Sequence, residues 1–387
     1  MPRPQCAEIQ IGSDSVCPMY KSQALFLLPH DTLGGAERVT TTLAEAAALS
    51  GEFELVTIVV LSRGDHGKLN HLKGYSNLTI IYLPFSGPSR ALFALARFLR
   101  TKSYDFVFSS LADINALLSL MRRSGILKTK YLVARESTMM FEREFGWKSH
   151  LVRVIYRLYG AQDLIISQTQ EMAFSLNANT GGKLERLVRV LPNPIPYRLV
   201  ESFGEVEEVG NEGVGPLRIV WCGRLSRVKS PHRAIEALAY LRDNGDPDAS
   251  LLFIGDGPLR HTLEALAKER QLEDRVRFAG HLEDPTSAMT QYDVGLVTSD
   301  IEGFPNVILE MLASGVRRVA STNCAGGLED VPGLTLSANS SPAVLARAIQ
   351  EARMNAGDPS LINKFIQDRH PELLLRRILG MNDHASR

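Results

Sequence analysis

Runs of aliphatic and β-branched residues alternate along this chain with segments whose apolar residues recur every three or four positions. The runs are four to seven residues long, as in strands buried within parallel sheets, and the intervening periodicity predicts helices. Their alternation predicts βαβ units and the α/β fold class. We expect strands at residues 24–28, 55–61, 78–83, 105–109, 131–134, 164–167, 187–191, 218–221, 251–254, 276–279, 294–298 and 318–321.

The chain divides at residues 201–217, an acidic, glycine-rich stretch without either periodicity. We interpret this stretch as a linker, because 387 residues exceed what one core usually organises. The prediction is a Rossmann-like domain at 1–200, a second at 218–369, and a leucine-rich helix at 370–387 that packs back on the first domain. Open parallel sheets bind ligands beyond the carboxyl ends of their strands, so binding residues are expected in the loops that follow the strands.

Composition and charge exclude several classes of protein. The 43 Lys and Arg residues balance 43 Asp and Glu residues, so overall basicity does not favour a nucleic-acid partner. No apolar run approaches the roughly 18 residues that span a bilayer, and the first 20 residues have no apolar signal-peptide core. We therefore expect a cytoplasmic protein.

The balanced charge is unevenly distributed, with a net charge of +7 over residues 1–200 and −7 over residues 201–387. Segments 89–102 and 147–159 of the basic half place Lys and Arg beside apolar residues at helical spacing. One interpretation is a pair of surface helices whose basic faces are solvated. The other is peripheral contact with an anionic surface, the inner face of the cytoplasmic membrane.

Two glycine-rich turns join a predicted strand to a predicted helix. Gly34 and Gly35 follow the first strand, and Gly255 and Gly257 follow the strand at 251–254. A turn without side chains lets backbone N–H groups approach a ligand at the positive end of a helix dipole, which favours phosphate. The second turn lacks the third glycine of a dinucleotide fingerprint, which disfavours a hydride-transfer enzyme.

Cations and carboxylates follow two other strands of the second half. Arg224 and Lys229 come after Gly223 in a strand-to-helix loop, where two cations can clamp a pyrophosphate. Glu302 precedes a predicted helix that contains Glu310, which is expected to point away from the core. Two such carboxylates can accept hydrogen bonds from the hydroxyls of a sugar or a ribose.

In this order the motifs resemble the retaining GT-B glycosyltransferases of family 4 (GT4, glycosyl transferases group 1), which use nucleotide-activated sugars. The resemblance covers most of the chain and implies two Rossmann-like domains whose parallel sheets face each other across a cleft. It rests on Gly34-Gly35-Ala36-Glu37, Gly223-Arg224-Leu225 with Lys229, Gly255-Asp256-Gly257-Pro258, Val276-Arg277-Phe278-Ala279-Gly280, and Glu302-Gly303-Phe304-Pro305-Asn306 with Glu310.

The resemblance also implies roles for these residues. Arg224 and Lys229 would hold the donor diphosphate, and Glu302 the transferred sugar. Glu310 would hold the ribose, while the paired glycines of the first domain close on the phosphates. The remaining substrate-binding candidates are Gly223, Gly255, Gly257, Gly303, Phe304, Pro305 and Asn306.

The reaction so implied is retaining transfer of a hexose from a nucleotide sugar, expected to be a UDP-sugar, to a lipid-linked, lipopolysaccharide or polysaccharide acceptor. The nucleotide sugar is a substrate, so no cofactor is expected. The cationic clamp favours a phosphate leaving group over glycoside hydrolysis, which needs only paired carboxylates. The alternatives are a nucleotide-sugar-binding subunit without transfer activity and a GT-B nucleotide-sugar epimerase.

One position of this chain differs from the family pattern, and one short motif resembles that of a different glycosyltransferase fold. Members of the family often have a histidine after the strand corresponding to 131–134, where this chain has Arg135 and Glu136, so these become candidates for positioning or deprotonating the acceptor hydroxyl. Asp246-Pro247-Asp248 looks like the metal-binding DxD motif of another glycosyltransferase fold. It precedes the strand at 251–254, at the edge opposite the expected site, so we predict no metal.

Overall fold

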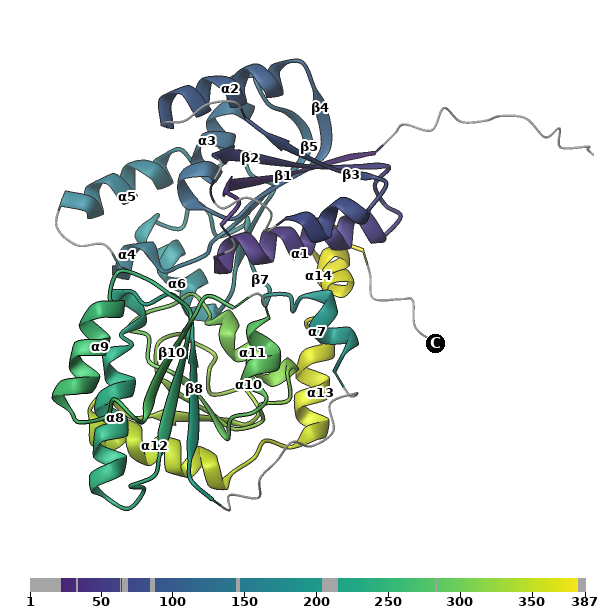
Figure 1. Ribbon diagram of the computed structural model, residues 1–387. Coiled ribbons are helices and arrows are strands. Elements are labelled where there is room, and N and C mark those ends of the chain that lie inside the picture. Colours follow the sequence, from purple (N-terminus) through teal and green to yellow (C-terminus); the bar gives the residue numbers. More distant parts are fainter. Residues whose placement is uncertain are drawn as a thin grey trace, which may run out of the picture.

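The computed structural model describes residues 22–381 apart from residues 33, 63, 65–68, 84–87, 144–146, 204–214 and 283. Most of the predicted linker, and the N-terminal segment in which no signal peptide was predicted, lie outside the described residues. The described chain forms two α/β domains, one above the other in Figure 1. None of its helices combines the length and the apolar character needed to cross a bilayer.

A seven-stranded parallel sheet forms the first domain, in the order β3-β2-β1-β4-β5-β6-β7. The strands are β1 Gln23–His30, β2 Leu55–Ser62, β3 Leu78–Tyr82, β4 Ser103–Ser109, β5 Lys128–Arg135, β6 Leu164–Ser167 and β7 Val188–Val190. The helices are α1 Gly35–Leu49, α2 Pro88–Arg100, α3 Ala112–Arg123, α4 Met140–Arg143, α5 Trp147–Arg157 and α6 Gln170–Asn179, with the 3₁₀ helix η1 Asn70–Gly74. Helix α7 Tyr197–Glu201 follows and buries Leu199 and Val200 in the core of the second domain.

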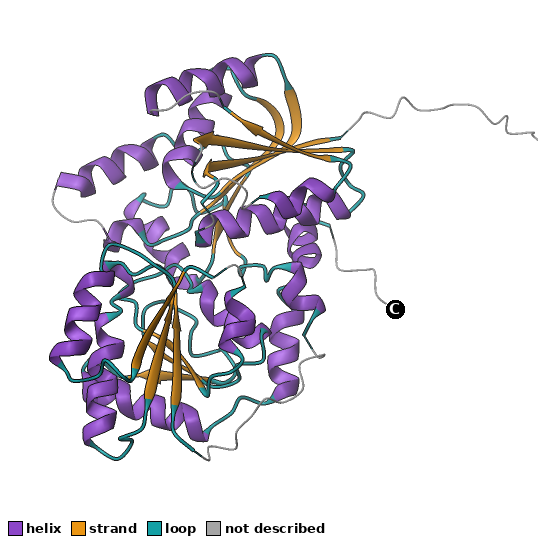
Figure 2. Ribbon diagram, in the orientation of Figure 1, coloured by secondary structure: helices purple, strands orange, loops and turns teal. Residues whose placement is uncertain are grey.

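Strand β1 shows why this sheet is covered on both faces. Successive side chains of a strand point to opposite sides, so Phe26 packs with Leu43 of α1, whereas Leu25 and Leu27 pack with Leu95 of α2. All five side chains are essentially inaccessible to solvent. The uninterrupted apolar run of β1 therefore serves two cores, with helices on each side of the sheet (Figure 2).

A six-stranded parallel sheet forms the second domain, in the order β10-β9-β8-β11-β12-β13. The strands are β8 Arg218–Cys222, β9 Ser250–Ile254, β10 Val276–Gly280, β11 Val294–Val297, β12 Val319–Thr322 and β13 Leu334–Ser337. The helices that follow β8 are η2 Arg227–Lys229 (3₁₀), α8 His232–Asp243, α9 Arg260–Glu269, α10 Pro285–Met289, α11 Asn306–Ala313, α12 Pro342–Met354, α13 Pro359–Gln367 and α14 Pro371–Ile378.

All twelve predicted strands are present, and β13 is an additional one. Strand β13 is four residues long, lies at the sheet edge, and buries only Ser337, so it has no apolar run that periodicity could detect.

The chain passes between the domains twice, after β7 and after α13. The two passages lie side by side, because the N–H of Ile195 donates to the carbonyl oxygen of Arg369 at 3.1 Å. Beyond the second passage, α14 lies against α1 (Figure 1) and buries Leu374, Leu375 and Ile378 in the core shared with α1 and β1. The last helix in sequence therefore packs with the first helix of the chain.

Candidate active site

Helix α1 begins with a glycine turn that touches the second domain. Gly34 is the N-cap and provides no side chain to cap the helix. A β carbon on Gly34 would lie 2.6 Å from Oε2 of Glu37, and one on Gly35 would lie 3.3 Å from Nδ2 of Asn306. The same Nδ2 of Asn306 donates to the carbonyl oxygen of Gly35 at 3.1 Å. The glycines therefore allow α1 to approach the start of α11 closely.

Helix α11 carries Glu310, which was expected to point away from the core. The residue does leave the apolar core of its own domain, but it is not exposed, because α1 of the first domain covers it. Nη1 of Arg38 lies 2.6 Å from Oε1 of Glu310, whose side chain is 9% exposed. The carboxylate raises the pKa of the Arg38 guanidinium. Arg38 was not predicted as a site residue, although it directly follows the Gly34–Glu37 motif.

Lys229 and Glu302 meet within the second domain. The Nζ of Lys229 donates to Oε1 of Glu302, and the hydroxyl of Ser299 donates to the same oxygen at 2.7 Å. Arg224, on the same loop as Lys229, is exposed and makes no ion pair with any described residue. This loop therefore holds one cation against the carboxylate and leaves a second available to a ligand.

Cys222, the last residue of β8, feels the charges of several of these groups. Burial, and then the charge of Glu310, raise the pKa of its thiol to about 12, while Arg38 and Lys229 act in the opposite direction. Charges shift a pKa in this way only from nearby. The charges of Glu310, Lys229 and Arg38 thus act on the thiol at the carboxyl end of β8, while Arg38 pairs with Glu310 and Lys229 with Glu302.

Gly255 and Gly257 act by close packing. A β carbon on Gly255 would lie 2.0 Å from the carbonyl oxygen of Gly223, and one on Gly257 would lie 2.5 Å from that of Leu225. The N–H of Gly255 donates to Gly280 at 2.7 Å, and that of Gly257 donates to the adjacent carboxylate at 2.7 Å. Both N–H groups are thus engaged within the domain, and ligand binding by these glycines stays a prediction. Because these glycines have no side chain, the turn after β9 packs directly against the loop that carries Arg224 and Lys229.

Gly303, Phe304 and Pro305 lie where the strand ends of the two domains meet. A β carbon on Gly303 would lie 2.8 Å from Nε2 of Gln168 and 2.9 Å from the carbonyl oxygen of Ser137. Pro305 is the N-cap of α11, and Phe304 lines a pocket between the domains. The segment that carries Glu302 thus packs closely against the first domain.

Arg135 belongs to a hydrogen-bond network across this interface. Its Nη2 donates to Oδ1 of Asn193 at 2.6 Å, and Nδ2 of Asn193 donates to Gln168 at 2.9 Å and to Asn306 at 2.5 Å. Burial lowers the pKa of Arg135 to about 9. Asn193 and Gln168 were not predicted as site residues. The one available signal was the sequence Pro192-Asn193-Pro194, which places a polar residue between prolines directly after a strand.

Glu136, by contrast, points into the first domain. Its carboxylate accepts hydrogen bonds from the hydroxyls of Tyr156 at 2.5 Å and Tyr159 at 2.7 Å, and from Asn115 at 3.5 Å. Burial raises the pKa of Glu136, and these hydrogen bonds oppose that rise. The interpretation of Glu136 as a group that handles the acceptor is corrected accordingly, because both oxygens are enclosed and already have partners.

The acidic pair resembling a DxD motif is held away from this region. Asp246 accepts hydrogen bonds from Gln350 at 2.8 Å and Arg353 at 3.2 Å, and Asp248 pairs with Arg275 at 2.8 Å. The residues covered by the structure include no group of three His, Cys, Asp or Glu side chains that could hold a metal ion. A reaction without metal stays a prediction of the sequence.

Comparison with known proteins adds independent findings. Residues 204–356 match the family described as Glycosyl transferases group 1. Two N-acetylgalactosaminyltransferases of Campylobacter jejuni, named for substrates linked to diphospho-undecaprenol, are 26% and 27% identical over 304 and 320 residues. These matches cover 77% and 76% of this chain and 78% and 80% of the relatives.

Solved structures share the fold over nearly the whole chain. Anabaena Alr3699/HepE in complex with UDP-glucose has a TM-score of 0.72 at 18% identity, covering 92% of this chain and 98% of that chain. The apo form of the lipopolysaccharide outer core galactosyltransferase WaaB has a TM-score of 0.68 at 19% identity, covering 93% and 98%. The paired parallel sheets show the GT-B fold, residues 204–356 match the glycosyl transferases group 1 family, and the relatives are named glycosyltransferases, so the chain is an enzyme of the hexosyltransferase class.

Proposed function

We propose that this enzyme transfers a hexose from a nucleotide sugar, a UDP-sugar, to a lipid-linked or lipopolysaccharide-type glycan, with retention at the anomeric carbon. The observation that carries the proposal is the contact of Lys229 with Glu302 beside the exposed Arg224. The names of the two Campylobacter relatives, which specify lipid-linked glycan substrates, support the class of acceptor.

The proposed chemistry follows from the charges of this loop. When the bond between the anomeric carbon and the diphosphate breaks, negative charge grows on the diphosphate. Cations that are already positioned stabilise that charge without reorganisation, which makes Arg224 and Lys229 suitable partners for it. Because Lys229 also contacts Glu302, the diphosphate and the sugar would be held on the two sides of the bond that breaks.

The test is a mass-spectrometric screen of UDP-, GDP- and ADP-sugars with the full chain, with and without EDTA. Slow hydrolysis of a UDP-sugar, undiminished by EDTA, is expected and needs no acceptor. An epimerised donor would instead support the epimerase, and donor binding without hydrolysis or transfer to any glycan acceptor would support a binding subunit. Hydrolysis that depends on added metal would contradict the metal-free proposal.

We also propose that the first domain contacts an anionic membrane surface. On α2, Phe93 is 71% exposed beside the exposed Arg97 and Arg100. On α5, Leu151 and Val154 are exposed together with two arginines of the same helix. Apolar side chains among basic residues combine burial in the interface with attraction to anionic lipid.

Vesicle co-sedimentation tests this contact. The fraction bound should rise with the anionic lipid content and fall as salt screens the basic residues. Phe93→Ser should weaken binding, whereas Met354→Ser, at an exposed position of α12 in the second domain, should not. Binding that ignores both lipid charge and salt would rule the membrane contact out.

A further inference from the structure

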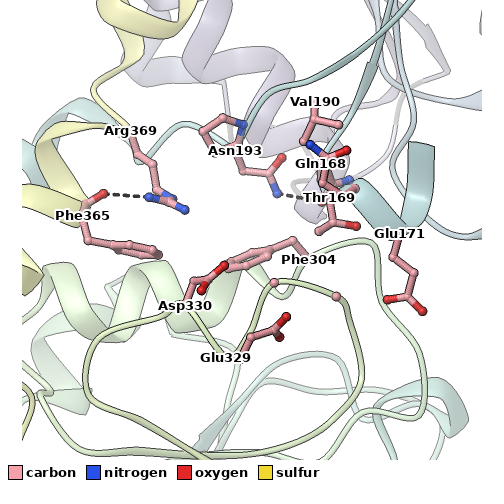
Figure 3. Close-up of a pocket in the computed structure, with 14 residues that line it drawn as sticks. Gln168, Thr169, Glu171, Val190, Asn193, Phe304, Glu329, Asp330, Phe365 and Arg369 are labelled. Atoms are coloured by element: carbon pink, nitrogen blue, oxygen red, sulfur yellow. Dashed lines mark hydrogen bonds between the residues drawn. The ribbon is translucent and has the colours of Figure 1, made fainter. Parts of the chain in front are cut away.

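A pocket of about 440 Å³ lies between the domains on the side of Phe304. Its walls are the start of α6 and the end of β7 from the first domain, and the loop after β12 and the end of α13 from the second (Figure 3). Its volume falls within the range of about 300–1,000 Å³ that small-molecule sites occupy. Of the residues predicted to bind substrate, only Phe304 lines it, so this pocket is distinct from the cation loop and its carboxylates.

The walls combine apolar rings with hydrogen-bonding groups. The rings are those of Phe304 and Phe365. The carboxylates of Glu171, Glu329 and Asp330 also line the pocket, are exposed, and form no ion pair with any described residue. Free carboxylates accept hydrogen bonds from hydroxyls, and aromatic rings pack against apolar C–H faces. This combination suits a pyranose, which presents hydroxyls at its rim and C–H groups on its faces.

Arg369 adds a single cation at one end of the pocket. Its guanidinium lies 3.4 Å from the centre of the Phe365 ring, and its Nη1 donates to the Phe365 carbonyl oxygen at 3.0 Å. Figure 3 shows the guanidinium directed into the pocket, and its Nη2 makes no hydrogen bond within the described part of the chain. Burial lowers the pKa of Arg369 to about 10, so the group stays charged at neutral pH. It can donate to a carbonyl oxygen of a ligand.

The charge of the lining decides among ligand classes. Three carboxylates and one cation line the pocket, so its lining disfavours a phosphate or another anion and favours a neutral ligand. A neutral sugar that bears an acyl group satisfies both ends, with hydroxyls toward the carboxylates and the acyl carbonyl toward Arg369. Phe304 is two residues beyond Glu302, so a sugar in this pocket lies beside the loop proposed to hold the donor sugar.

We propose that this pocket is a subsite for a neutral, N-acylated pyranose of the glycan acceptor. The proposal rests on the transferase function proposed above, and it adds the chemical class of the sugar that the enzyme reads beside the transfer site.

The test is a ligand-observed NMR titration of the full chain with three methyl glycosides: N-acetyl-α-D-galactosaminide, α-D-glucoside and α-D-glucuronide. Each titration is done without UDP and again with saturating UDP, so that binding is compared with the donor site free and occupied. The N-acetyl glycoside should bind most tightly and the glucuronide most weakly. Displacement of the N-acetyl glycoside by UDP, or tighter binding of the glucuronide, would overturn the proposal.

Variants locate the binding in the pocket. Glu329→Gln and Asp330→Asn, both exposed and therefore compatible with folding, should each weaken binding of the N-acetyl glycoside about three- to tenfold by removing a charge-assisted hydrogen bond. Arg369→Gln should reduce the preference for the N-acetyl glycoside over the glucoside, and Arg369→Lys should restore part of it. The matched control Glu351→Gln, exposed on α12, should bind like the wild type.

The two proposals fail in different ways. Equal binding by wild type, Glu329→Gln and Asp330→Asn would refute the subsite, whatever the donor assay shows. Absence of donor hydrolysis and of transfer, together with the expected pattern of sugar binding, would refute the transferase proposal while leaving the pocket as a saccharide site.

Discussion

The ion pair between Arg38 and Glu310 competes with the ribose that Glu310 is proposed to hold. Because α1 and Arg38 cover a carboxylate that is only 9% exposed, we expect a nucleotide to displace Arg38 before its ribose is bound. Replacing Arg38 with Gln removes the charge and leaves a shorter polar side chain. We therefore predict that Arg38→Gln binds UDP more tightly than the wild type.

The magnitude follows from the exposure of the two side chains. Exposed ion pairs contribute about 0.2–1 kcal/mol, whereas removing one partner of a fully buried pair costs about 3–5 kcal/mol. Glu310 is 9% exposed, but Arg38 is 34% exposed, which allows water to screen the pair. We therefore take the contribution of this ion pair to be about 1 kcal/mol, at the upper end of the range for exposed pairs. Since about 1.4 kcal/mol corresponds to a tenfold change in affinity, UDP should bind roughly fivefold more tightly.

Calorimetric titration with UDP measures this difference without turnover. The matched control is Arg275→Gln, which removes an arginine paired with Asp248 at the far edge of the second domain and should leave the affinity unchanged. The gain in Arg38→Gln should shrink at high salt, because salt already weakens the pair in the wild type. Weaker UDP binding would show that Arg38 contacts the nucleotide, and unchanged affinity would show that Glu310 is not its ligand. Either result refutes the reasoning.

Three further predictions address other parts of the site. Lys229→Ala should lower turnover at saturating donor by about 10²–10³-fold, or about 2.7–4 kcal/mol, because the leaving diphosphate and Glu302 both lose a cation; steady-state kinetics measures this. Gly257→Ala should destabilise the fold by about 1–3 kcal/mol in thermal or chemical unfolding, because its methyl group would lie 2.5 Å from the Leu225 carbonyl oxygen. Glu136→Gln should remove part of the pH dependence of stability. Because burial raises the pKa of Glu136, its contribution is complete below the pKa of the unfolded chain and is lost as the pH rises through the folded-state pKa.

Each of these predictions has a contrary result. Near-normal turnover of Lys229→Ala would remove Lys229 from the donor site. An unchanged unfolding midpoint for Gly257→Ala would mean that the loops of Gly257 and Leu225 can move apart without loss of folding free energy. For Glu136, denaturant unfolding at several pH values should show the wild type losing stability relative to the Gln variant as the pH rises, and parallel curves would contradict the assigned burial effect.

The sequence by itself determined the elements of this protein and the place of its chemistry along the chain. Burial on both faces of a parallel sheet requires consecutive apolar residues, so the central strands could be predicted from local patterns. Glycines, cations and carboxylates that directly follow strands must lie at the carboxyl edge of a sheet, which predicted Lys229 and Glu302 for one region. The edge strand β13 escaped prediction because a short, half-exposed strand does not require such a run.

The tertiary structure alone decided which faces of the two domains meet. Arg38 and Glu310 are 272 positions apart, and Asn193 and Asn306 are 113 apart, so no local periodicity relates them. The same holds for the neighbours Arg135 and Glu136, one of which enters the interface network while the other is enclosed by tyrosines. Local patterns predict whether a side chain can be buried. Which residue covers it depends on how surfaces that are distant in the sequence pack together.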